Sequence, residues 1–111
     1  MSSSTIVHLL HILLVGSLFL YVGIKGKNIP PPMYPFLLGL GIFIFFYHSY
    51  VAYNRMKKGS PIWINLIHMF IIAPLLVYIG YNNTNTKQRY YEILLMLGFA
   101  SIGYHGYYLL F

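Results

Sequence analysis

Four apolar stretches make up most of the chain, and short polar segments separate them. The apolar stretches cover residues 5–24, 33–53, 62–81 and 90–111. Each has about the 20 residues that an α-helix needs to cross the hydrocarbon core of a bilayer. The pattern therefore predicts an all-α protein, a membrane four-helix bundle that forms a single transmembrane domain over residues 1–111.

The charged residues support this prediction, because they lie mainly between the apolar stretches. The chain is 59% hydrophobic and carries a net charge of +6, and its mean hydropathy is +0.68. Positive charge confined to short loops is typical of contact with lipid headgroups. No polar segment is long enough to build the basic face that nucleic-acid binding requires. We therefore expect the lipid bilayer as a partner, and no nucleic acid.

The loop charges favour one orientation in the membrane only slightly. The first and third connections share a side, and the second connection lies on the opposite side. Because basic loops tend to stay in the cytoplasm, a bias of four charges against three gives little preference. The basic residues are Lys25, Lys27, Lys87 and Arg89 on the first side and Arg55, Lys57 and Lys58 on the second.

The sequence also aligns with itself when it is shifted by 57 residues. Residues 8–54 then match residues 65–111 without a gap, and 14 of the 47 positions are identical. Each repeat holds two spans, so both copies enter the membrane from the same side, which gives two parallel two-helix repeats. Short connections make consecutive helices neighbours, so equivalent helices are expected on the diagonals of the bundle.

Four histidines occupy equivalent places in the two repeats. His11 and His68 lie six residues inside the starts of spans one and three, and His48 and His105 lie five or six residues before the ends of spans two and four. These offsets correspond to roughly 8–9 Å of helix rise, so the four side chains are expected in one layer. Ionisable groups at this depth are costly unless they face partners inside the bundle. Because imidazole binds zinc, copper and iron, the layer is a candidate site for a transition metal or for haem. The haem reading uses the diagonal pairs, His11 with His68 and His48 with His105.

Two glycines accompany these histidines. Gly41 and Gly98 each lie seven residues before the histidine of span two or span four, close to two helical turns along the same face. A missing side chain admits a neighbouring helix closely, or it leaves room for a flat ligand such as a porphyrin. Both glycines are therefore included in the candidate cofactor site.

The same histidines also fit a purely structural interpretation. Tyr47, Tyr50, Tyr104 and Tyr107 flank two of them, and aromatic belts are usual where a bilayer meets water. The imidazoles would then bond to tyrosine hydroxyls, lipid or backbone carbonyls. His8 is left out of the candidate site, because its repeat counterpart is Asn65, an amide that cannot be the same kind of ligand.

The segments "WINLIHMFIIAPLLVYIGY" and "YEILLMLGFASIGYHGYYL" resemble small uncharacterised multi-span membrane proteins encoded by large DNA viruses of protists and algae. The likeness covers most of the second repeat. It implies a viral membrane, or a host membrane modified by a virus, as the location. It implies no catalytic or binding residues for this chain.

Three functions are compatible with the sequence. We favour a structural or assembly component of a membrane, which acts as a homo-oligomer or within a larger membrane complex. Histidine-ligated binding of a transition metal or haem is the alternative, and proton or ion movement through imidazoles that titrate near neutral pH is the third. An enzyme is not expected, because Glu92 at the start of the fourth span is the chain's single acid and the chain has no cysteine.

Overall fold

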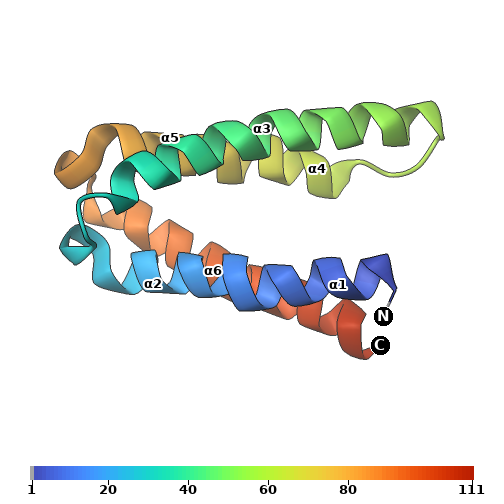
Figure 1. Cartoon of the computed structure of the whole chain (residues 1–111), viewed down its shortest axis with the longest axis horizontal. Coiled ribbons are helices and arrows are strands. Elements are labelled where there is room, and N and C mark those ends of the chain that lie inside the picture. Colours follow the sequence, from blue (N-terminus) through green and yellow to red (C-terminus); the bar gives the residue numbers. More distant parts are fainter. Residues whose placement is uncertain (1) are drawn as a thin grey trace. The chain divides into compact units, whose positions relative to one another are not determined.

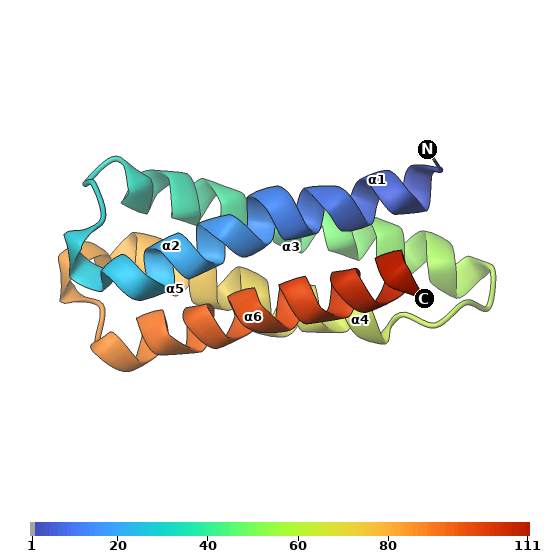
Figure 2. The same cartoon turned by 90° about the horizontal axis from the view of Figure 1, so that it is seen from below.

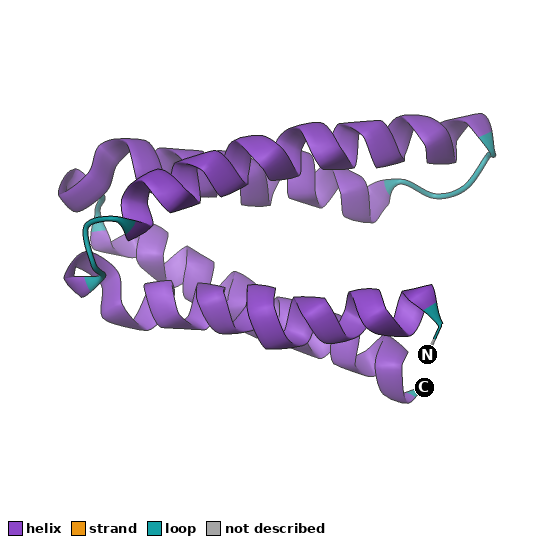
Figure 3. Ribbon diagram, in the orientation of Figure 1, coloured by secondary structure: helices purple, strands orange, loops and turns teal. Residues whose placement is uncertain are grey.

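A computed structural model gives the fold and describes residues 2–111 (Figure 1). Helices joined by short loops account for this part of the chain, and no strand occurs within it (Figure 3). Four helical segments are long and apolar enough to cross a membrane, at Ser3–Asn28, Met33–Lys57, Trp63–Asn85 and Gln88–Leu110. The predicted all-α class and the four long helices are confirmed, and the helices begin or end a few residues outside the predicted stretches.

The second and fourth long helices are uninterrupted α-helices, α3 (Met33–Lys57) and α6 (Gln88–Leu110). The first and third each contain a π-helical segment and end in a 3-10 turn. The first consists of α1 (Ser3–Leu10), η1 (His11–Gly16), α2 (Ser17–Lys25) and η2 (Gly26–Asn28). The third consists of α4 (Trp63–Ile67), η3 (His68–Ile72), α5 (Ala73–Asn82) and η4 (Asn83–Asn85).

The long helices pack in two pairs. Unit 1 joins the chain up to Ile29 with Lys87–Phe111, and α6 packs along α1, η1 and α2 (Figures 1 and 2). Unit 2 is Pro30–Thr86, in which α3 packs along α4, η3 and α5. The two-span repeats 8–54 and 65–111 are therefore not the compact units. Each unit instead combines one helix from the first repeat with one helix from the second.

Glycine allows the backbones within each pair to approach closely. A Cβ atom added to Gly80 of α5 would lie 2.6 Å from the backbone nitrogen of Leu38 on α3. A Cβ atom added to Gly23 of α2 would lie 2.6 Å from the Cβ of Leu95 on α6. Small residues are the usual means of close helix contact in membranes. The side chains around these contacts are fully buried, and they include Phe19, Val22, Tyr91 and Leu94 in unit 1 and Tyr34, Leu37, Leu76 and Ile79 in unit 2.

The two units share local backbone features at positions that are 57 residues apart. The π-helical segments begin at His11 in unit 1 and at His68 in unit 2. The backbone then turns through a positive φ at Gly26 (55°) and at Asn83 (57°), where the 3-10 turns begin. Glycine adopts this conformation freely, whereas asparagine is strained by it.

Candidate functional site

Unit 2 contains a stacked pair of imidazoles. His48 lies on α3 and His68 begins η3, and their ring centroids are 4.0 Å apart with an angle of 17° between the rings. The Nδ1 of His68 donates a hydrogen bond to the carbonyl oxygen of Ile64, 2.8 Å away. The Nδ1 of His48 donates to Oδ1 of Asn65 on α4, 2.9 Å away. Asn65 is only 5% exposed, so this hydrogen bond is a buried link between the two helices.

Unit 1 contains a similar pair. His11 begins η1 and His105 lies on α6, and their ring centroids are 4.3 Å apart with an angle of 32°. The Nδ1 of His11 donates to the carbonyl oxygen of Val7, 2.8 Å away. The Nδ1 of His105 lies 2.8 Å from the Nδ1 of His8 on α1, and one of these nitrogens donates to the other. His105 is only 7% exposed.

His8 and Asn65 make equivalent hydrogen bonds in the two units, although the sequence analysis left both out of the candidate site. Each faces the Nδ1 of the histidine on the partner helix at 2.8–2.9 Å. His8 was set aside because an amide cannot replace an imidazole as a metal ligand, but both side chains can accept a hydrogen bond. Each lies three residues before the histidine that begins the π-helical segment, and therefore on the same helix face. This shared position was the signal in the sequence.

The structure thus brings together His11 with His105 and His48 with His68. These four imidazoles are partly or fully buried, and each contacts the histidine on the helix that is packed against its own. Of the neighbouring tyrosines, Tyr47, Tyr50 and Tyr107 are more than half exposed, whereas Tyr104 is partly buried and packs against His105. The diagonal pairs His11 with His68 and His48 with His105 each join residues of different units, and they stay a prediction, as does a single layer of four.

Stacking limits what the histidine pair of unit 2 can coordinate. The nitrogen lone pairs lie in the plane of each ring, so two nearly parallel rings cannot both direct a lone pair at one ion between them. The hydrogen bonds to Ile64 and Asn65 also occupy the Nδ1 atoms of both rings. Within residues 2–111, no group of three or more histidine or carboxylate side chains is arranged to hold a metal ion.

The two glycines of the candidate site lie where helices meet. A Cβ atom on Gly41 would come within 2.9 Å of the carbonyl oxygen of Ala73. A Cβ atom on Gly98 would come within 3.1 Å of the Cβ of Phe19. These contacts favour the close approach of a neighbouring helix at both glycines over a space for a flat ligand.

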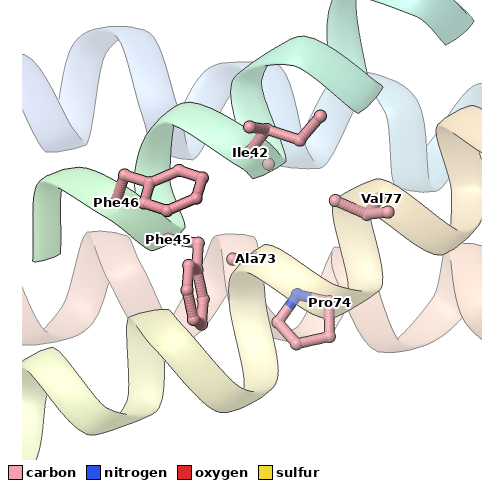
Figure 4. A pocket seen from close by; sticks show the side chains of 7 residues that line it. Ile42, Phe45, Phe46, Ala73, Pro74 and Val77 are labelled. Atoms are coloured by element: carbon pink, nitrogen blue, oxygen red, sulfur yellow. The ribbon is translucent and has the colours of Figure 1, made fainter. Parts of the chain in front are cut away.

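A shallow apolar groove of about 200 Å³ lies beside Gly41, between α3 and α5 (Figure 4). Its walls contain no histidine and no other side chain able to ligate iron. The groove therefore gives no support to a porphyrin slot next to His48, and its chemistry suits a hydrocarbon chain. The lining residues are Gly41, Ile42, Phe45, Phe46, Ala73, Pro74 and Val77.

The arrangement can orient imidazoles, share protons between them and link helices through buried hydrogen bonds. The two units differ in the atoms that face each other. In unit 1 a nitrogen of His8 faces a nitrogen of His105, and in unit 2 a nitrogen of His48 faces the amide oxygen of Asn65.

No protein-family model matches the chain, and no curated protein or solved structure matches it either.

Proposed function

We propose that the chain is a multi-pass integral membrane protein with a structural or assembly role. The observation that carries the membrane assignment is the exposure of the four long helices. Only 17% to 33% of the residues in their most apolar windows are buried inside the protein. A water-soluble protein rarely exposes large continuous apolar patches, whereas in a bilayer lipid chains cover this surface. Large exposed side chains occur on all four helices, among them Leu13, Phe43, Phe70 and Phe99.

The structural role is supported by how the helices use their few polar and small residues. The buried polar side chains Asn65 and Thr86 bond to other groups of unit 2. Gly23 and Gly80 serve helix contact. The exposed aromatic residues of α3, such as Phe46 and Tyr50, offer a surface to lipid, to a second copy or to a larger membrane complex. Large aromatic side chains are common at the centres of protein interfaces.

The membrane assignment can be tested by expressing the chain and extracting the membranes with alkaline carbonate. We expect the protein to remain in the membrane pellet and to float with lipid in a density gradient. Recovery in the soluble fraction would contradict it. For the assembly role, we expect chemical crosslinking of intact membranes to give discrete complexes that contain the chain. A chain that remains monomeric and uncrosslinked at native expression level would argue against that role.

Two alternatives are separable from the structural role by purification. Haem binding is the second candidate, because both units contain paired imidazoles. It predicts a Soret band in the absorption spectrum of the detergent-solubilised protein. Proton movement predicts that vesicles containing the protein dissipate a pH gradient faster than empty vesicles. We expect neither signal from a structural component, and either signal would replace the structural proposal.

We also infer that the chain arose by duplication of a two-span hairpin. The support is the recurrence of features 57 residues apart: the π-helical starts at His11 and His68, the positive φ at Gly26 and Asn83, and the histidine bonds to the carbonyl oxygens of Val7 and Ile64. Location in a viral or virus-modified membrane is a separate proposal that rests on the sequence resemblance. Immunolabelling of infected cells would test it. Labelling confined to host membranes that the virus does not modify would contradict it.

A further inference from the structure

We propose that His8 and His105 form a binding site in unit 1 for one divalent transition-metal ion, and that copper(II) binds there most tightly. The two Nδ1 atoms face each other across 2.8 Å from two packed helices. Copper(II) prefers square-planar or tetragonal coordination, in which two adjacent nitrogen ligands about 2.0 Å from the ion lie roughly 2.8 Å apart. The present separation therefore suits two adjacent ligands of one ion, once both rings turn so that their lone pairs point at the ion rather than at each other. Imidazole is a good ligand for copper, and copper(II) binds nitrogen sites more tightly than the other divalent metals of its row.

The surroundings hold both rings in place for this role. The ring of His8 stacks against that of Tyr108 at a centroid distance of 6.1 Å and an angle of 14°. His105 is almost fully buried, and Tyr104 packs its ring edge-on against it at 5.0 Å. The ring contacts with Tyr108 and Tyr104 thus restrict the ring orientations before any ion arrives. Preorganised ligands lose less conformational entropy when they bind.

An ion with two protein ligands needs water to complete its coordination, and the site lies near the ends of both helices. His8 lies five residues after the start of α1 and His105 lies five residues before the end of α6, or about 8 Å of helix rise from each end. His8 is only partly buried. Water can complete the coordination at this depth. The nearest further titratable group is His11, whose ring lies 4.3 Å from that of His105 and whose Nδ1 is bonded to Val7.

Binding requires both Nδ1 atoms to present a lone pair. In the hydrogen-bonded state, one Nδ1 carries a proton and donates a hydrogen bond to the other Nδ1. When the ion binds, the donating ring carries its proton on Nε2 instead of Nδ1, and a neutral imidazole can make this change without a net loss of protons. No oxidant or reductant takes part.

Unit 2 supplies a matched control within the same molecule. There, the position equivalent to His8 holds Asn65, which faces His48 at nearly the same distance. An amide oxygen is a poor ligand for copper(II) compared with imidazole. The proposal therefore predicts one site per chain, in unit 1 alone, although the histidine pairs of the two units are otherwise alike. It does not depend on the structural role proposed above.

The test is a copper(II) titration of the full chain in detergent, followed by electron paramagnetic resonance. We expect one tightly bound equivalent with two nitrogen ligands. His8→Asn copies the arrangement of unit 2 and keeps a hydrogen-bond acceptor, so we expect it to fold and to lose the bound equivalent. Asn65→His should gain a second equivalent, and the double variant should again bind one. Circular dichroism of each variant checks that the helices are intact.

The outcomes distinguish the site from simpler explanations. Loss of the ion in His8→Asn together with gain in Asn65→His would support the proposal. A wild-type chain that binds no copper would show that the two imidazoles form a hydrogen bond only. Unchanged binding in His8→Asn would place the ion on other histidines, and a folded Asn65→His chain without a second equivalent would show that the facing geometry is not sufficient. Each of these last three results would overturn the proposal.

Discussion

The side chain of Asn65 accepts a hydrogen bond from Nδ1 of His48 across 2.9 Å and so ties α4 to α3 inside unit 2. Asn65 is buried, and a buried donor left without its acceptor costs about 1–3 kcal/mol. Hydrogen bonds between membrane helices are worth less on average, about 0.6 kcal/mol and up to about 1.7 kcal/mol. We therefore expect Asn65→Leu to lower the free energy of unfolding by about 1 kcal/mol.

A double-mutant cycle measures this link directly. The single variants Asn65→Leu and His48→Leu and their combination would be unfolded with denaturant in mixed micelles. If the hydrogen bond carries the effect, the two changes will not be additive, and the coupling will be about 1 kcal/mol. Strictly additive losses would mean that the two side chains contribute through packing alone.

The contact of Gly80 with Leu38 gives a second prediction. A Cβ atom at Gly80 would lie 2.6 Å from the backbone nitrogen of Leu38 and 2.7 Å from the carbonyl oxygen of Tyr34. Backbone atoms cannot move aside as a flexible side chain can, so α3 and α5 must separate. Gly80→Val should therefore lower the stability of the protein by about 1–3 kcal/mol, the usual cost of overpacking.

Gly39→Val is the matched control for this change. Gly39 lies on the exposed face of α3, and a Cβ atom there would have no neighbour within 4 Å. Both variants alter the intrinsic helix preference in the same way, so the difference between them reports the helix contact. Equal melting temperatures for the two variants in detergent would show that the close approach is not required for the fold.

The backbone of Asn83 leads to a prediction of the opposite sign. Its φ of 57° and ψ of −132° lie in a region that favours glycine, and the equivalent position in unit 1 is Gly26. Strain of this kind costs about 1–3 kcal/mol. Asn83→Gly would relieve it but lose the hydrogen bond from the Thr84 backbone N–H to Oδ1 of Asn83.

We expect the relief to exceed the loss, because Thr84 is exposed and water replaces its partner. Asn83→Gly should then raise the free energy of unfolding by about 1 kcal/mol, as measured by thermal unfolding in detergent. Asn85→Gly, two residues further on, has no positive φ to relieve and should be neutral or destabilising. A less stable Asn83→Gly variant would show that the asparagine side chain matters more than the strain.

The helices could be predicted from the sequence because each depends on a local pattern. An apolar run of about 20 residues specifies a spanning helix whatever its neighbours are. The pairing of helices depends instead on which faces fit together, and the repeat did not reveal it. Gly23 matches Gly80 in the alignment, yet each contacts a helix of the other repeat, at Leu95 and at Leu38. Because the two repeats present similar helix surfaces, a helix can pair with a helix of the other repeat as favourably as with one of its own repeat.

The sequence singled out histidines that the structure brings into contact, but not the pairs in which they meet. His11 contacts His105 and His48 contacts His68, and cofactor binding by these residues stays a prediction. His8 was left out of the candidate site because its counterpart Asn65 cannot be the same kind of metal ligand. Their shared property is hydrogen-bond acceptance, which imidazole and amide have in common, and only the contact with the facing histidine makes that property visible.

The final prediction concerns orientation in the membrane. Gly26 and Gln88 meet at one end of unit 1, where an added Cβ on Gly26 would lie 3.3 Å from Oε1 of Gln88. The first and third connections, with four basic residues between them, therefore share a side there, and the second connection holds three. Because basic residues tend to remain in the cytoplasm, two added lysines should decide the orientation.

The double variant Ser3→Lys with Ser4→Lys should draw the termini to the cytoplasm, and Thr84→Lys with Asn85→Lys should draw the third connection there. All four positions are exposed, so the packing is spared, and reporter fusions at the carboxyl end would measure the orientation. The same orientation in both double variants would mean that something other than the loop charges determines it.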